Sequence, residues 1–190
     1  MLLTVGILSV PRRLQMMSTL VAELTKQVEG RPVEILCLLD NWVRSIGAKR
    51  NAIIQLAQGS FLTFVDDDDW IEPNYIESLL ASIQANADAD CIVFDVMVHG
   101  WGGQPKVCRY GKEYHYSEDV EAFYRLPNHL MCHKTENCRR FPFPDISYWE
   151  DTQFSDAIAT AIAKQVRIPA ALYQYRFSAA DSEAMKRRGC

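Results

Sequence analysis

Four consecutive carboxylates, Asp66 to Asp69, are the strongest chemical signal in a sequence of 190 residues. They directly follow residues 61–65, whose aromatic and β-branched side chains predict a buried strand. Neighbouring like charges raise one another's pKa unless a cation compensates them, so the cluster favours a bound divalent metal over a solvated acidic turn. Carboxylate oxygens suit hard ions such as Mg²⁺, Mn²⁺ or Ca²⁺.

The spacing of this stretch excludes one kind of calcium site, the EF-hand loop. Counted from Asp66, Asp68 and Glu77 fall at two of its ligand positions. Trp70 and Ile71, however, stand where the loop needs an oxygen ligand and a glycine. Carboxylates at a strand end instead favour a metal that keeps coordination positions open for a phosphate-bearing substrate.

A second group of chemical residues, Lys49, Arg50 and Asn51, lies at the predicted start of a helix. Gly47 permits the preceding turn, and the first N–H groups of a helix point outward without intrahelical partners. Cations at this end oppose the helix dipole, so their presence favours a phosphate ligand, with a pair of ordinary surface charges as the alternative. Neither the Gly-x-x-x-x-Gly-Lys-Ser/Thr nor the Gly-x-Gly-x-x-Gly pattern of nucleotide-binding loops occurs.

A third group is the acid pair Glu150 and Asp151, which opens a further predicted helix. A carboxylate at a helix start beside a cleft can serve as general base for an acceptor hydroxyl. The alternative is that the two acids only cap the helix.

The elements that must position these residues alternate regularly over the first half of the chain. Apolar runs predict buried strands at residues 2–9, 33–39, 61–65 and 91–97. Helical periodicity predicts helices between them, over residues 14–28, from about Ala48 to Gly59, and after Pro73. This alternation predicts a sheet of parallel strands with right-handed crossovers.

Ligands of such sheets bind beyond the carboxyl ends of the strands, where the strand order reverses. Three successive strand ends carry polar or turn-forming residues, which are Ser9, Val10, Pro11 and Arg12, then Asp40 and Asn41, then Asp66 to Asp69. The sequence therefore predicts one binding cleft at this edge of the sheet.

The second half of the chain is less regular. A turn is expected at residues 101–105, short strands within 106–116, loops at 127–133 and 141–145, and a last strand at 170–177. Ser117, followed by three acids, predicts the start of a helix. About the last dozen residues are expected to lack order.

The composition constrains the class of protein and its partners. The length suits one domain, and a net charge of -4 gives no argument for a nucleic-acid or acidic-membrane partner. No apolar run approaches the roughly 20 residues of a membrane span, and the N-terminus lacks a basic leader. The six cysteines show no paired short spacing. We therefore expect a soluble, cytoplasmic protein with reduced cysteines.

The chain resembles glycosyltransferase family 2, whose members have the GT-A fold, at an ordered set of motifs. These are Asp40-Asn41, Gly47-Ala-Lys-Arg-Asn51, Phe64-Val-Asp-Asp-Asp-Asp-Trp-Ile-Glu-Pro-Asn-Tyr75 and Glu150-Asp151. The resemblance implies a single α/β domain over residues 1–190, with a Rossmann-like, mostly parallel central sheet flanked by helices. Residues 1–98 would bind the nucleotide sugar, and the smaller, irregular half, residues 99–190, would bind the acceptor and supply the catalytic base.

The resemblance also implies roles for the acids of the first half. Asp68 matches the residue that binds Mn²⁺ or Mg²⁺ on the donor diphosphate, and Asp66 matches the residue that contacts the ribose or shares the metal. Asp69 matches a further acid of the motif, and Asp67 is expected among the donor contacts. Asp40 matches the acid that reads the nucleotide base, usually uracil.

The basic segment and the later acid pair also match family positions. Lys49, Arg50 and Asn51 match the segment that lines the base and the phosphates. Asp151 matches the catalytic base of the inverting members, with Glu150 beside it.

The sequence departs from the family pattern in three respects. Leu8-Ser9-Val10-Pro11 replaces the commoner Ile-Pro-Thr-Tyr-Asn, so the donor contacts expected of residues 9–12 rest on their place at the strand end. Members often supply a late His to the metal, but no His follows residue 133, which leaves His129 as the candidate third ligand and a structural His as the alternative. The Gln-x-x-Arg-Trp motif of processive synthases is absent, which favours transfer of a single sugar.

Together these features predict a metal-dependent, inverting transferase that moves one sugar from a UDP-sugar to an acceptor hydroxyl, with Asp151 as general base. A retaining transferase or another nucleotide-sugar or nucleotidyl enzyme on the same fold is one alternative, and a non-catalytic nucleotide-sugar-binding module is another. The sequence specifies neither the sugar, nor the acceptor, nor the oligomeric state.

Overall fold

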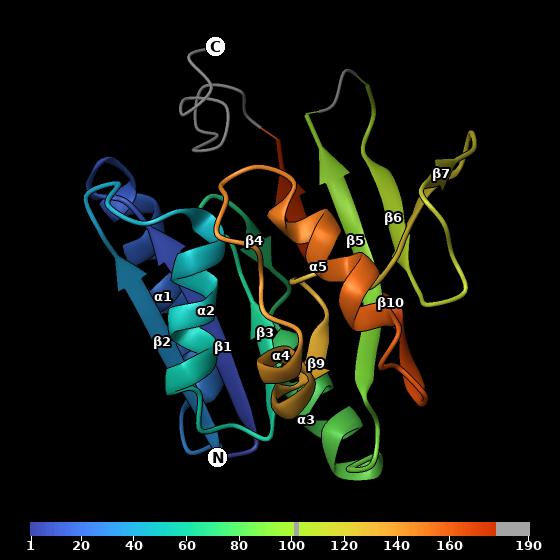
Figure 1. Cartoon of the computed structure of the whole chain (residues 1–190), viewed down its shortest axis with the longest axis horizontal. Helices are drawn as coiled ribbons and strands as arrows, with labels where there is room; N and C mark the ends of the chain where they lie inside the picture. The colour runs from blue at the N-terminus through green and yellow to red at the C-terminus, as the bar shows by residue number, and fades with distance from the viewer. Residues whose placement is uncertain (101–102, 178–190) are drawn as a thin grey trace.

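A computed structural model describes residues 1–100 and 103–177 as one ten-stranded sheet covered by helices on both faces (Figure 1). The strands are β1 (Leu3–Ser9), β2 (Val33–Leu39), β3 (Phe61–Phe64), β4 (Trp70–Ile71), β5 (Cys91–His99), β6 (Lys106–Tyr110), β7 (Ser117–Glu118), β8 (Ala122–Arg125), β9 (Cys132–Lys134) and β10 (Gln165–Arg176). The helices are α1 (Leu14–Val28), α2 (Ile46–Leu56), α3 (Tyr75–Ala85), α4 (Thr135–Arg140) and α5 (Glu150–Ala159), with a 3-10 turn at Pro11–Arg13.

The strand order is β2-β1-β3-β9-β5-β6-β8-β7, with β10 paired to both β5 and β4. The predicted strands β1, β2 and β3 are parallel neighbours. The fourth predicted strand, β5, runs the same way but does not touch β3, because the short antiparallel strand β9 lies between them. The strand order reverses around β1, and this places the ends of β1 and β3 at the switch point where ligands bind in such sheets.

The burial of the first two strands follows from their positions in the sheet. Every residue of β1 is buried because β2 and β3 flank it and helices cover both of its faces. The prediction that β2 is equally buried was wrong: β2 is the edge strand, and its residue Cys37 is exposed. The described cysteines, which are residues 37, 91, 108, 132 and 138, are all free.

Two apolar cores form, one on each face of the sheet. On one face, α1 and α3 pack together and bury Leu20 and Leu24 against β1. On the other face, α2 packs against α4 and α5, and the rings of Phe143 and Phe154 stack at 3.9 Å between centroids. In Figure 1, α2, α4 and α5 lie on the near side of the sheet. The second core matters for the site because it ties residues 141–145 and α5, which come late in the chain, to α2.

The irregular half departs from the sequence prediction at two places. The helix expected at Ser117 is absent; the Asp119 carboxylate accepts the backbone N–H groups of Glu121 and Ala122, both at 2.8 Å, and this turn leads from β7 into β8. The short elements β9 and α4 were not predicted, because three and six residues carry too little periodicity. Part of the turn expected at residues 101–105 and the whole C-terminal stretch expected to lack order (178–190) lie outside the described residues.

Within the described ranges, no helix combines the length and apolar character needed to cross a bilayer.

Candidate active site

The ends of β1, β2 and β3 are held together by side chains that the sequence places at these ends. The Ser9 hydroxyl donates to Asp67 Oδ2 at 2.5 Å. The fully buried Lys49 ammonium lies 3.3 Å from Asp40 Oδ1 and donates to the Ser9 carbonyl at 3.4 Å. The structure thus brings the three predicted strand ends into one site.

The four consecutive aspartates turn toward different partners. Asp66 faces Arg50 and His129, whereas Asp67 and Asp68 both pair with Arg13. Asp69 is buried and accepts the Tyr173 hydroxyl at 2.7 Å and the Arg176 backbone N–H at 2.7 Å, two residues at the end of β10. Two clusters result, each built around one guanidinium group.

The first, which we call the Arg50 cluster, consists of Arg50, Asp66, His129 and Glu150. Arg50 Nη1 lies 2.5 Å from Glu150 Oε1 and Nη2 lies 3.3 Å from Asp66 Oδ1, and the guanidinium also lies 5.3 Å from the centre of the Phe143 ring. His129 Nε2 lies 3.3 Å from Asp66 Oδ2, while its buried Nδ1 has no hydrogen-bond partner among the described residues. One buried arginine therefore joins the acid after β3 to the first acid of α5.

The charges of the Arg50 cluster compensate one another. Burial opposes ionisation of Asp66, but His129, Arg50 and Arg13 outweigh it and hold the pKa of Asp66 below its usual value. Burial likewise opposes the charge on Arg50, yet Glu150 and Asp66 raise its pKa. Asp66 is therefore ionised throughout the physiological pH range.

The second, the Arg13 cluster, consists of Arg13, Asp67 and Asp68. Arg13 Nη1 lies 2.8 Å from Asp67 Oδ1, and Nη2 contacts Asp68 Oδ2. Burial raises the pKa of Asp68 to about 7, and the charges of Asp66 and Asp67 add to this against the effect of Arg13. Arg13 was missed in the sequence analysis, although it directly follows Arg12 at the same strand end.

The remaining predicted residues at the end of β1 have separate surroundings. Val10 is fully buried, and Pro11 begins the 3-10 turn. The exposed Arg12 guanidinium lies 5.4 Å from the centre of the Trp42 ring. Trp42 has a φ of 63°, which is uncommon for a residue other than glycine.

Asp40 is held in its ionised form at the end of β2. Burial opposes ionisation, but the backbone N–H of Arg44, which donates to Oδ2 at 3.0 Å, and the charge of Lys49 hold the pKa of Asp40 below its usual value. The arrangement presents a carboxylate acceptor at the end of β2.

The expectation of free N–H groups at the start of α2 was wrong. Ser45 caps the helix by accepting the Ala48 N–H at 3.0 Å. The N–H groups of Ile46 and Gly47 donate to Ser147 Oγ at 3.2 Å and to the Ile146 carbonyl at 3.0 Å. The first turn of α2 is therefore occupied by residues 145–147 and is not an open phosphate site.

Gly47 and Asn51 hold this segment on α2. A Cβ at Gly47 would collide with the Pro144 carbonyl, so the close approach requires glycine. The Asn51 amide donates to the Phe143 carbonyl at 2.8 Å, and its oxygen accepts the Phe143 N–H at 2.9 Å. The donor contact predicted for Asn51 stays a prediction.

The two acids of α5 differ in their contacts. Glu150 is buried in its pair with Arg50, whereas Asp151 is half-buried and its Oδ1 accepts the Thr152 N–H at 2.8 Å. Burial raises the pKa of Tyr116, and the charge of Asp151 adds to this rise. Glu150 is thus paired with Arg50, and Asp151 lies beside a tyrosine; the catalytic roles predicted for both acids stay predictions.

The donor set fits a divalent cation that keeps open coordination positions. Among the residues that the structure describes, no three His, Cys, Asp or Glu side chains converge as a complete metal site. The carboxylates of Asp66 and Asp68 at this strand end are nevertheless oxygen ligands of the kind that a hard cation prefers, and they are the residues that would hold it. His129 reaches Asp66 and remains the candidate third ligand.

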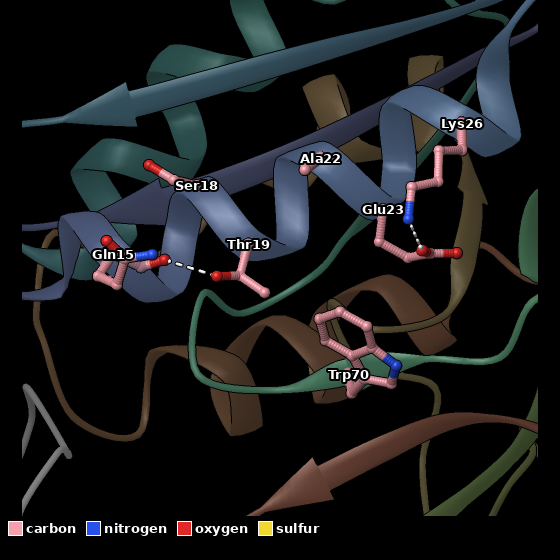
Figure 2. Close-up of a pocket in the computed structure, with 7 residues that line it drawn as sticks. All are labelled: Gln15, Ser18, Thr19, Ala22, Glu23, Lys26 and Trp70. Atoms are coloured by element: carbon pink, nitrogen blue, oxygen red, sulfur yellow. Dashed lines mark hydrogen bonds and ion pairs between the residues drawn. The ribbon is translucent and has the colours of Figure 1, made fainter.

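Two hollows that share lining residues lie beside the acidic strand end. The larger, of about 400 Å³, runs between α1 and the Trp70 indole, as Figure 2 shows, along Gln15, Ser18, Thr19, Ala22, Glu23 and Lys26. The smaller, of about 200 Å³, shares Gln15, Thr19 and Trp70 with it and reaches Asp67, Asp68 and Asp69. The larger hollow contains none of the clustered residues, so we place the chemistry at the Arg50 and Arg13 clusters.

The fold has relatives among solved structures. Staphylococcus aureus TarS 1-349 matches with a TM-score of 0.67 at 16% identity, over 93% of this chain and 60% of that one. Its complex with UDP-GlcNAc matches with a TM-score of 0.68 at 15% identity, over 98% of this chain and 61% of that one. The chain thus spans about three fifths of this relative. The likeness confirms the predicted α/β GT-A fold, with its mostly parallel central sheet flanked by helices.

Comparison of the sequence with known families shows the family to which the chain belongs. The model of glycosyl transferase family 2 matches residues 18–144. A putative glycosyltransferase of Bacillus subtilis (strain 168), EpsH, is 42% identical over 50 residues, which are 26% of this chain and 14% of EpsH. The chain belongs to glycosyltransferase family 2.

Proposed function

We propose that this chain transfers a single sugar from a UDP-sugar to an acceptor hydroxyl, with inversion and with Asp151 as general base. The observation that carries the proposal is the buried Arg50, which joins Glu150 to Asp66 and so fixes the start of α5 beside the end of β3. An acceptor at Asp151 and a donor at the strand ends would then meet at one place. TarS, whose fold is shared, has been solved with UDP-GlcNAc and with UDP, which supports a UDP-sugar donor.

The donor half of the proposal assigns residues 1–98 to the nucleotide sugar. Asp40, held ionised by Lys49 and Arg44, would accept an N–H of the uracil base. Asp68 with Asp66 would hold Mn²⁺ or Mg²⁺, which would neutralise the charge on the departing diphosphate.

The acceptor half assigns residues 99–190 to the acceptor and the base. Asp151 takes the proton of the acceptor hydroxyl while its oxygen attacks the anomeric carbon. The bond from that carbon to the diphosphate oxygen breaks on the opposite face, and its electron pair leaves with UDP. Glu150 and Arg50 position the helix that carries Asp151.

The test separates the donor site from the base. UDP, with GDP as control, is titrated calorimetrically with and without Mn²⁺ into the native protein, Asp68→Ala and Asp151→Asn, and UDP release from UDP-GlcNAc is then measured. We expect Mn²⁺-dependent UDP binding that Asp68→Ala abolishes and Asp151→Asn preserves, with turnover lost in Asp151→Asn. Normal turnover by Asp151→Asn would refute the assigned base, and absent UDP binding would refute the donor. The anomeric configuration of the product decides between inversion and retention.

A further inference from the structure

Two aromatic side chains are exposed next to the base that we propose. In the described part of the chain, Tyr116 (48%) and Trp149 (55%) are the aromatic residues among the large apolar side chains that remain exposed. Both adjoin Asp151: Trp149 is the N-cap of α5, and the Tyr116 hydroxyl lies 3.3 Å from Oγ1 of Thr152. Two exposed aromatic side chains at one helix start are apolar surface of the kind that marks a ligand-binding site.

The backbone of Trp149 is held in a costly conformation. Its φ of 67° lies in the left-handed region, which costs a residue with a Cβ roughly 1–2 kcal/mol. The ring packs edge-on against Tyr148, 5.0 Å between centroids, yet it stays more than half exposed. Neither helix capping nor burial accounts for a tryptophan here, since the N-cap makes no side-chain hydrogen bond. Backbone strain of this kind concentrates at functional sites.

Tyr116 approaches Asp151 from a different element, the segment that precedes β7. The Arg125 guanidinium lies 4.9 Å from the centre of its ring. The Asp151 carboxylate, the Thr152 hydroxyl and the Arg125 guanidinium thus supply an acceptor, a donor–acceptor and a donor of hydrogen bonds beside the Tyr116 ring, at the helix start that Trp149 caps. Aromatic surface with a few convergent polar groups is the chemistry that binds a sugar ring, whose C–H faces are apolar and whose rim carries hydroxyls.

We propose that Trp149 and Tyr116 form the acceptor subsite and that the acceptor is a carbohydrate, a ring of which lies against these side chains with one hydroxyl at Asp151. This inference rests on the proposed function, because it takes Asp151 as the base.

Saturation-transfer NMR on the full chain with UDP and Mn²⁺ tests the subsite. The probes are the methyl β-glycosides of glucose, galactose and N-acetylglucosamine, with glycerol and a serine-containing pentapeptide as hydroxyl compounds that are not sugars. The variants are Trp149→Ala, Trp149→Phe and Tyr116→Ala, and Val120→Ala is the matched control at a site that is 96% exposed. Calorimetric UDP binding is measured on each variant to show that the donor site is intact.

We expect at least one glycoside, and neither of the other hydroxyl compounds, to bind the native protein and Val120→Ala. Its affinity should fall about fivefold to tenfold in Trp149→Ala and in Tyr116→Ala and should be largely retained in Trp149→Phe, with UDP binding unchanged. Absence of glycoside binding, or equal binding by Trp149→Ala, would overturn the subsite. If the native protein does not bind UDP, the proposed donor is refuted. Glycoside binding that depends on Trp149 would still support the subsite in that case.

Discussion

The Arg50 cluster and the Arg13 cluster each pair one guanidinium with two carboxylates near the end of β3. In the Arg50 cluster, His129 adds to the arginine, and the pKa of Asp66 is lowered. In the Arg13 cluster, burial and the neighbouring charges outweigh the arginine, and the pKa of Asp68 is raised to about 7. The difference is that Asp66 has two basic partners, whereas Asp68 shares one arginine with Asp67 and is buried beside two like charges.

Removing each arginine gives the largest expected contrast. Arg50→Ala leaves Asp66 and Glu150 without their buried partner and should lower the free energy of unfolding by about 3–5 kcal/mol. Arg13→Ala should cost less, and saturating Mn²⁺ should restore most of its loss because the ion replaces the missing charge. Urea denaturation with EDTA or with Mn²⁺ measures both. Full rescue of Arg50→Ala by Mn²⁺ would contradict the distinction between the clusters.

Neutralising single acids of the Arg13 cluster should separate their roles. Asp68→Asn should weaken Mn²⁺-dependent UDP binding by about a hundredfold, since it removes a charged ligand of the cation. Asp67→Asn should weaken it less, because Asp67 is held by Ser9 and Arg13. Calorimetric titration compares the two variants. Equal losses would mean that Asp67, not only Asp68, holds the ion.

The two pKa shifts predict opposite changes in stability. In EDTA at pH 7, Asp66→Asn should destabilise the fold by roughly 2 kcal/mol, because an ionised partner of Arg50 is lost. Asp68→Asn should stabilise it by about 1 kcal/mol or more, because it removes a charge that the fold disfavours. Thermal denaturation of both variants beside the native protein measures the sign. Destabilisation by Asp68→Asn would show that Arg13 already compensates this acid.

The pH dependence follows from the same shifts. Asp68 is raised from 3.8 to about 7, so its contribution to stability is complete below about pH 4 and is lost as the pH rises to about 7. Asp66 has a lowered pKa, so its contribution is present above its ordinary pKa and is lost only in stronger acid.

Below about pH 7, protonation of Asp68 should weaken Mn²⁺ binding by about tenfold per pH unit. Titrations at several pH values measure this slope. A matching slope in Asp68→Asn would assign the pH dependence to another group.

The sequence predicted the part of the fold that depends on local periodicity. The four apolar runs form strands that run in the same direction, and three polar strand ends meet, because parallel strands bring their carboxyl ends to one edge. The insertion of β9 between β3 and β5 could not be predicted from the sequence, because a three-residue strand has no periodic pattern of its own. Its place in the sheet depends on pairing with β3 and β5.

The prediction of the site was limited in the same way, because contacts between distant segments cannot be read from local sequence patterns. The acids were found by type and position, and they lie at the strand ends and at the start of α5. Which cation each acid meets is a property of tertiary packing, so Arg13 was missed and the start of α2 was wrongly expected to be open. The roles proposed for these residues in donor and acceptor binding stay predictions.

The close contact at Gly47 has a consequence for how relatives of this chain can diversify. Residues 143–147 are attached to α2 by backbone hydrogen bonds and by a contact that excludes any side chain at position 47. The segment that leads into Glu150 and Asp151 is therefore held by a helix of the first half of the chain, although it lies in the second half of the sequence. Residues 103–125 carry no such attachment in the contacts described above. An engineer who exchanges acceptor specificity between relatives should graft these residues together with the side chain at position 149, and leave 143–147 with the recipient.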